Sequence, residues 1–224
     1  MSKWEIHNVD CLDFLRSLPD GSVDAVVMDP PYGIDYSSGH ATDELWKGGR
    51  SIQGDKTTAV RDAALLLLPE VPTLVFGSWR APRPEKTRTV LVWDKGGALG
   101  MGALDIPWKP DHEEIYVLGY GWAGRRDCGS VVRHPPVQSM AKNGRVHPNE
   151  KPVGLMLKLM KKLPVGCTVL DPFAGSGTTG VACIQTGRNF IGLEIDPVYA
   201  EIARRRCQVA EESVALFKEI RGVE

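Results

Sequence analysis

The fold of this chain is decided by a stretch that reads Val169-Leu170-Asp171-Pro172-Phe173-Ala174-Gly175-Ser176-Gly177-Thr178-Thr179-Gly180. An apolar strand is predicted to run into a turn of small residues, and a helix is predicted to start at Thr178. Small residues let the backbone approach a ligand closely, and the amino end of a helix offers N–H groups that no helical carbonyl accepts. The stretch therefore predicts a strand, a ligand-binding turn and a helix in succession.

An acidic residue follows at a distance that fits this interpretation. The next apolar run, Phe190-Ile191-Gly192-Leu193, ends at Glu194, which lies 17 residues after Gly177. A carboxylate at the end of the second strand is placed to bind the hydroxyl groups of a ribose. A Gly-x-Gly pattern alone is weak evidence, but the strand before it, the helix after it and Glu194 together predict a nucleoside site.

A second motif, Asp29-Pro30-Pro31-Tyr32, follows an apolar run at residues 23–28 that reads as a buried strand. The prolines end the strand because neither can donate a backbone hydrogen bond. The Asp29 carboxylate and the Pro30 carbonyl then form two fixed acceptors beside the flat ring of Tyr32. This arrangement suits a planar ring that carries an amino group, such as adenine or cytosine. A strand-ending turn in which Asp29 merely caps the next segment is the alternative.

The two motifs together resemble those of the DNA amino-methyltransferases, and the order of the motifs, 142 residues apart, is similar to the β class of that family. The resemblance implies S-adenosylmethionine as cofactor and double-stranded DNA as partner. It also implies catalytic roles for Asp29, Pro30, Pro31 and Tyr32. The cofactor-binding residues that it implies are Asp10, Cys11, Asp29, Lys151, Pro152, Asp171, Phe173, Ala174, Gly175, Ser176, Gly177, Thr178 and Glu194. Asp10 could equally be a helix N-cap.

The family chemistry is methyl transfer to the exocyclic amine of a base that has been flipped out of the duplex. Acceptors at Asp29 and Pro30 would hold the amino hydrogens and stabilise the positive charge that develops on the nitrogen. The leading Asp favours the N6 amine of adenine. The N4 amine of cytosine is the first alternative. Methylation of RNA or of a protein glutamine, and a nucleoside-binding module without catalysis, are the others.

Strands and helices alternate along the 224 residues, which predicts an α/β fold with a doubly wound, mostly parallel sheet and helices on both faces. The resemblance implies a seven-stranded Rossmann-like methyltransferase sheet with one reversed strand, the last of the seven. We expect one catalytic domain over residues 1–224, with a small target-recognition insertion at about residues 96–146. The polar stretch at residues 33–54 is either a loop that closes on substrate or disordered.

The charge distribution predicts a nucleic-acid surface in the middle of the chain. Residues 79–146 carry 11 basic and 7 acidic residues, whereas residues 1–78 carry 6 and 12. A basic segment in an acidic chain is typical of a DNA-binding surface, although a solvated face explains it as well. The predicted DNA contacts are Arg80, Arg125, Arg126, Arg133, Lys142 and Arg145. The run Arg204-Arg205-Arg206 is expected to be a solvated face.

Other features of the composition bound the class of protein. The five cysteines form no Cys-x-x-Cys pair, so neither a metal site nor a disulfide framework is expected. No apolar run approaches the roughly 20 residues of a membrane span, and no signal-peptide pattern is present. We therefore expect a cytoplasmic protein without membrane contact. A homodimer and a cognate restriction enzyme are left open as further partners.

Overall fold

The computed structural model of the chain describes residues 2–34, 56–97, 105, 107–108, 110–137 and 150–222. The strands are β1 (Trp4–Asn8), β2 (Ala25–Met28), β3 (Thr73–Gly77), β4 (Thr89–Asp94), β5 (His112–Leu118), β6 (Val131–Arg133), β7 (Thr168–Asp171) and β8 (Asn189–Glu194). The helices are α1 (Cys11–Arg16), α2 (Ala59–Leu67), α3 (Val153–Met160), α4 (Thr178–Gln185) and α5 (Pro197–Arg221). Residues 35–54 of the predicted polar loop, together with Lys142 and Arg145, lie outside the described residues.

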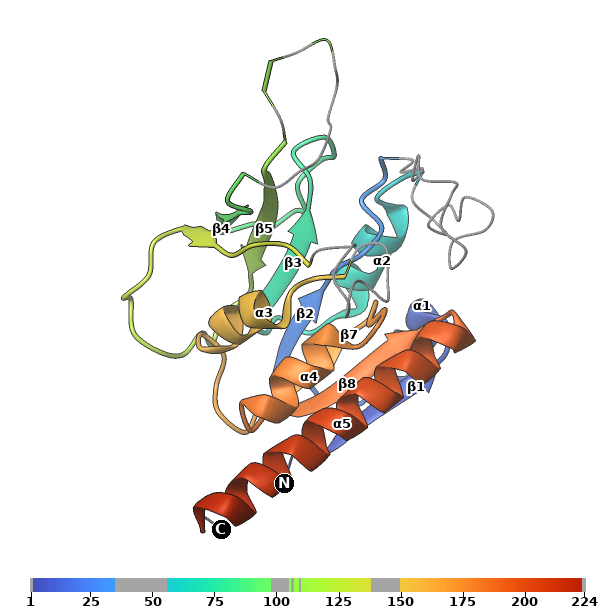
Figure 1. Ribbon diagram of the computed structural model, residues 1–224. Helices are drawn as coiled ribbons and strands as arrows, with labels where there is room; N and C mark the ends of the chain where they lie inside the picture. Colours follow the sequence, from blue (N-terminus) through green and yellow to red (C-terminus); the bar gives the residue numbers. More distant parts are fainter. Residues whose placement is uncertain are drawn as a thin grey trace.

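The strands form one sheet in the order β1-β8-β7-β2-β3-β5-β4-β6, covered by helices on both faces (Figure 1). Helices α3, α4 and α5 pack on one face, and α1 and α2 pack on the other. Strand β2 is fully buried between these layers and contributes alternate residues to each: Ala25 and Val27 face one core, and Val26 and Met28 face the other. The doubly wound α/β fold expected from the sequence is confirmed.

Two details of the sheet differ from the expectation. Among the described residues the sheet has eight strands rather than seven. The additional strand is the short β6, which pairs with β4 and was not predicted from the sequence. The three residues of β6 are too few for a periodic pattern. The reversed strand is β5, which runs antiparallel to both of its neighbours, β3 and β4. The other described pairs are parallel.

The edge of the sheet where the parallel strands end is called the carboxyl edge below. Strands β2 and β7 are neighbours in the sheet, so Asp29 and Asp171 both stand at this edge although they are 142 residues apart in the sequence. From β7 the chain winds through α4 to β8, and from β2 it winds through α2 to β3 in the opposite direction. Doubly wound sheets bind their ligands in a crevice outside the strand ends at such a reversal, so a ligand site is expected here.

None of the helices in the described part of the chain combines the length and the apolarity needed to cross a bilayer. Helix α5 has 25 residues, but its exposed face is largely polar and its buried face is made of small residues. Ala200, Ala203 and Cys207 of this face pack on the body of the protein.

Candidate functional site

The Asp29 carboxylate lies directly after β2, and both of its oxygens already have partners. Tyr32 donates its hydroxyl to Oδ1 at 2.8 Å, and the Lys151 ammonium donates to Oδ2 at 2.7 Å. Pro30 is buried and Pro31 is half-buried, so the turn is packed against the protein. The structure therefore brings the predicted motif together, but the carboxylate is part of a hydrogen-bonded cluster rather than an isolated acceptor.

The cluster contains two further charged residues that the sequence analysis missed, Glu113 and Lys95. Glu113 Oε2 lies 3.1 Å from the Tyr32 hydroxyl and 3.4 Å from Lys151 Nζ, and Glu113 Oε1 accepts from Lys95 Nζ at 2.6 Å. The negative charges of Asp29 and Glu113 are thus balanced by the positive charges of Lys151 and Lys95, and the four groups surround the Tyr32 hydroxyl. Lys95 directly follows the carboxyl end of β4, and this position could have identified it as a candidate site residue from the sequence. Glu113 lies near the start of β5, and only the reversal of this strand brings it to the carboxyl edge.

The two carboxylates of this cluster differ in proton affinity. Burial raises the pKa of Asp29, and the charge of Glu113 adds to this rise, while Lys151 opposes it. Burial also favours the protonated form of Glu113, but Lys151 and Lys95 outweigh it and hold the Glu113 pKa below its usual value. Burial and the neighbouring carboxylates raise the pKa of the Tyr32 phenol well above its usual value. Asp29 is therefore the better proton acceptor of the two carboxylates.

Lys151 was predicted to contact the cofactor, and the structure shows it at the Asp29 carboxylate. Its side chain is almost fully buried, and its ammonium lies 5.4 Å from the centre of the Tyr32 ring and 5.2 Å from that of Phe76. Desolvation disfavours the ammonium, but Asp29 and Glu113 outweigh it and raise the Lys151 pKa. The next residue, Pro152, is the N-cap of α3, so the start of this helix fixes the position of the lysine.

The glycine turn between β7 and α4 adopts the close-packed geometry that its small residues predict. Gly177 is the N-cap of α4 with a φ of 79°, and a Cβ at this position would lie 2.9 Å from the Ala203 Cα of α5. The turn is also tied to the end of β8. Glu194 accepts from the N–H of Gly175 through Oε2 and from the N–H of Asp196 through Oε1, each at 2.8 Å.

Asp171 ends β7 inside this turn, where its carboxylate accepts from the Thr179 hydroxyl at 2.5 Å and the Phe173 N–H at 3.0 Å. Burial raises the pKa of Asp171 to about 7, and the negative charges of Asp29 and Glu194 contribute to the rise. Burial likewise raises the pKa of Glu194. The carboxyl edge therefore gathers carboxyl groups, Asp29, Asp171 and Glu194, whose proton affinity burial has raised.

Arg206 joins the glycine turn to the segment that precedes α3. It donates to the Ser176 carbonyl at 2.9 Å and to the Ser176 hydroxyl at 2.7 Å, and it forms an ion pair with Glu150 at 2.7 Å. The expectation of a solvated face is therefore wrong for Arg206. It is also wrong for Arg204, which donates to the Ile6 carbonyl at 3.0 Å. A buried turn needs partners for its polar groups, and Arg206 of α5 supplies two of them.

The remaining predicted cofactor residues stand at the end of β1, beside β8. Asp10 is the N-cap of α1 and accepts from the Leu12 N–H at 2.8 Å, which confirms the capping role. Val9 donates its N–H to the Glu194 carbonyl at 3.2 Å, so this strand end lies next to the glycine turn. Cys11 is buried, and burial raises the pKa of its thiol to about 11.

The four described arginines of the predicted DNA surface are exposed but lie at two different edges. Arg80 follows the end of β3, and Arg133 ends β6, so both stand at the carboxyl edge. Arg125 and Arg126 belong to the loop after β5, which leaves the sheet at the opposite edge. The Arg125 carbonyl accepts from Lys162, just beyond the far end of α3.

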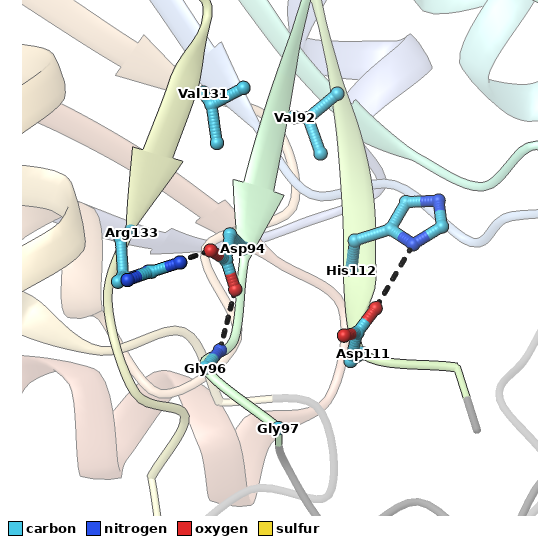
Figure 2. A pocket seen from close by; sticks show the side chains of 8 residues that line it. All are labelled: Val92, Asp94, Gly96, Gly97, Asp111, His112, Val131 and Arg133. Carbon is cyan, nitrogen blue, oxygen red and sulfur yellow. Dashed lines mark hydrogen bonds and ion pairs between the residues drawn. The ribbon is translucent and has the colours of Figure 1, made fainter. Parts of the chain in front are cut away.

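Arg133 also lines an open pocket of about 700 Å³ at the ends of β4 and β6 and the start of β5 (Figure 2). Its guanidinium donates to Asp94 at 2.7 Å, and His112 lies 3.5 Å from Asp111. His112 and Glu113 are successive residues of β5 and point to opposite faces of the sheet. The pocket therefore lies on the other face of β5 from the Asp29 cluster.

Comparison with known proteins identifies sequence relatives over almost the whole chain. A family model described as DNA methylase matches residues 78–205. The chain is 28% identical over 222 residues to the putative methylase YubD of Escherichia coli, covering 92% of this chain and 90% of the relative. It is also 28% identical to the type II methyltransferase M.Cfr9I of Citrobacter freundii, covering 92% of this chain and 88% of the relative.

Solved structures share the fold. The structure of M1.HpyAVI in complex with SAM superposes with a TM-score of 0.60 at 22% identity, covering 91% of this chain and 99% of that chain. The cytosine-N4-specific PvuII DNA methyltransferase superposes with a TM-score of 0.69 at 15% identity, covering 92% of this chain and 86% of that chain. These similarities support the α/β architecture described above.

Proposed function

Because this chain belongs to the DNA methylase family, we propose that it transfers a methyl group from S-adenosylmethionine to the N6 amine of a flipped-out adenine in DNA. The observation that carries the proposal is the position of Asp29 directly after β2, held by Tyr32 and Lys151 beside the glycine turn. A carboxylate oxygen has two lone pairs, so each Asp29 oxygen can accept an amino hydrogen in addition to its present partner.

The chemistry of the crevice fits S-adenosylmethionine. The cofactor has two cationic groups, a sulfonium and an ammonium, and the carboxylates of Asp171 and Glu194 stand beside the glycine turn, where Asp29 and Glu194 raise the pKa of Asp171. Glu194 would accept hydrogen bonds from the ribose hydroxyls of the cofactor. The glycine turn at residues 173–178 would hold the part of the cofactor where the nucleoside joins the methionine. Asp10 and Cys11 would flank the adenine ring of the cofactor. When bound, the cofactor supplies an electrophilic methyl group.

The side chains of this protein would position and polarise the target amine. Asp29 and the Pro30 carbonyl would hold its hydrogens, which turns the nitrogen lone pair away from the ring. The negative charge of Asp29 would stabilise the positive charge that forms on the nitrogen as the new bond is made. The Tyr32 ring would stack on the flipped base, an interaction worth about 1–3 kcal/mol.

Adenine is proposed over cytosine because the motif begins with Asp29, as is usual for N6-adenine enzymes that resemble this chain. A cytosine-N4-specific enzyme among the structural neighbours makes N4 methylation of cytosine the second candidate. The same carboxylate and carbonyl could hold either amine, since both are planar amino groups on an aromatic ring.

We further propose that the chain acts on double-stranded DNA as one catalytic domain with a small recognition insertion at about residues 96–146. Arg80 and Arg133 would contact phosphates near the crevice, because both stand at the carboxyl edge. Lys142 and Arg145 stay predicted contacts, whereas Arg125 and Arg126 stand at the opposite edge of the sheet and are not proposed as contacts. A homodimer and a cognate restriction enzyme also stay predictions.

The test is incubation of the protein with tritiated S-adenosylmethionine and DNA, followed by digestion and mass spectrometry of the nucleosides. We expect N6-methyldeoxyadenosine from the native protein and a loss of activity of at least about a hundredfold for Asp29→Ala, the range for loss of one stabilising group. Calorimetry with the cofactor should show nearly equal binding by both proteins. N4-methyldeoxycytidine would establish the second candidate, and the absence of any methylated nucleoside would overturn both.

A further inference from the structure

The hydroxyl of Tyr32 faces two carboxylates but has one hydrogen. Its oxygen lies 2.8 Å from Asp29 Oδ1 and 3.1 Å from Glu113 Oε2, and both distances are within hydrogen-bonding range. Ionised carboxylates can only accept hydrogen bonds. When Asp29 and Glu113 are both charged, one hydrogen therefore serves two acceptors, and one of the two contacts is incompletely satisfied.

One additional proton satisfies both contacts. With the proton on Asp29, the carboxyl group donates to the Tyr32 oxygen and Tyr32 donates to Glu113. With the proton on Glu113, both hydrogen bonds run in the opposite direction, and Tyr32 donates to Asp29. The two states differ only by a shift of each hydrogen along its own hydrogen bond, and the phenol is neutral in both.

The two lysines hold the carboxylates in the orientation that this exchange requires. Lys151 binds Asp29 at Oδ2, and Lys95 binds Glu113 at Oε1, so the other oxygen of each group is directed at Tyr32. The Glu113 side chain is 20% exposed, and β5 carries it at the rim of the sheet. Asp29 is 22% exposed, but the proposed target base would cover it, so Glu113 is the carboxylate that can still exchange protons with water.

We infer that Tyr32 and Glu113 form a relay that removes the proton released by methylation. The inference rests on the proposed function. The target amine uses its lone pair to form the new N–C bond, so the nitrogen becomes positively charged and must lose one proton per methyl group. This proton passes to Asp29 Oδ1. The Asp29 hydrogen then moves to Tyr32 as the Tyr32 hydrogen moves to Glu113, and Glu113 releases a proton to water.

The difference in proton affinity opposes the transfer from Asp29 to Glu113 and favours the release of the proton from Glu113 to water. Burial and Glu113 raise the Asp29 pKa, so Asp29 accepts a proton readily. Lys151 and Lys95 outweigh the burial of Glu113 and lower its pKa, so Glu113 does not retain the proton. Asp171 also acts on this group of charges from β7. Glu113 reaches the substrate only through Asp29 and Tyr32, so it is a positioning residue and not a catalytic one.

The relay is tested by following the methyl group and the proton separately in a single turnover. Rapid quenching with tritiated S-adenosylmethionine measures methyl transfer, and stopped-flow absorbance of a pH indicator in weak buffer measures proton release. The native protein should release one proton per methyl group without a lag. In Glu113→Gln, methyl transfer should continue while proton release lags by about a hundredfold, the low end of the range for acid–base groups.

Glu114→Gln is the matched control. Glu114 is the next residue of β5, accepts from the Tyr116 hydroxyl at 2.8 Å and pairs with Arg83 at 2.8 Å, but it faces away from Asp29. This variant should give coincident curves, as the native protein does. Thermal unfolding and cofactor calorimetry establish that each variant is folded.

A second variant covers the case in which Glu113→Gln does not fold. Tyr32→Phe keeps the ring that would stack on the base but removes the hydroxyl that joins Asp29 to Glu113. Proton release should again lag behind methyl transfer. Coincident curves in Glu113→Gln, or in Tyr32→Phe if only that variant folds, would overturn the relay. A native protein that transfers no methyl group would overturn the proposed function and the relay with it.

Discussion

The Lys151 ammonium lies 2.7 Å from Asp29 Oδ2, although 122 residues separate the two in the chain. Removing one partner of a buried ion pair leaves an uncompensated charge and costs about 3–5 kcal/mol. We therefore expect Lys151→Met to lower the free energy of unfolding by about that amount near neutral pH. Without the ammonium, the Asp29 pKa rises further, so the loss should shrink as the pH falls. Urea denaturation at several pH values measures this, with the exposed Lys158→Met on α3 as control.

Asp171 predicts a second pH dependence, this time of the native protein. Its pKa is about 7 in the folded chain, where burial favours the neutral form, against about 3.9 for an unfolded aspartate. The folded state binds this proton more tightly, so its contribution to stability falls as the pH rises from about 4 to about 7 and is constant above. Asp171→Asn lacks this titration. The native protein should thus lose stability relative to the variant across that window, and parallel pH curves would contradict the assignment.

Glu194 gives a prediction for cofactor affinity. In Glu194→Gln, an amide N–H group would face the N–H of Gly175 or of Asp196, and one acceptor for the ribose would be lost. Hydrogen bonds to charged groups contribute about 1.5–3 kcal/mol, so the affinity for S-adenosylmethionine should fall by about tenfold or more. Calorimetry measures the affinity. The exposed Glu201→Gln should bind as the native protein does, and equal affinities for all three would exclude this role of Glu194.

The location of the DNA interface follows from which arginines alter the salt dependence of binding. Each phosphate contact contributes a slope of about −0.9 to the plot of log K against log salt. Arg80→Gln should flatten the slope by about this amount, because Arg80 stands at the carboxyl edge. The double variant Arg125→Gln, Arg126→Gln should leave it unchanged. The reverse result would place the interface at the opposite edge, beside the far end of α3.

Much of the fold and of the site could be predicted because short-range patterns determine them. The glycine turn, the prolines after β2 and the N-cap at Asp10 each depend on local backbone geometry, which the residue types specify. The carboxyl ends of parallel strands meet at one edge of the sheet, so Asp29, Asp171 and Glu194 could be placed near one another without coordinates.

The partners of these residues could not be found in the same way. Glu113 lies near the start of its strand, and only the antiparallel pairing of β5 brings its side chain within hydrogen-bonding distance of Lys95 and Tyr32. Arg206 faces the glycine turn because the packing of the 25-residue helix α5 on the sheet fixes which of its side chains point toward the turn. Such contacts depend on tertiary packing between distant segments, which no local pattern encodes.

The adjacency of Glu150 and Lys151 also has a consequence for mutational coupling. Glu150 pairs with Arg206, which holds Ser176 of the glycine turn, whereas Lys151 pairs with Asp29. A displacement of one ion pair must displace the other, because a single planar peptide unit joins the two residues. Substitutions at Arg206 and Asp29 should therefore be non-additive in the free energy of unfolding, and a double-mutant cycle measures the excess. An additive result would mean that the glycine turn and the carboxylate after β2 contribute to stability independently.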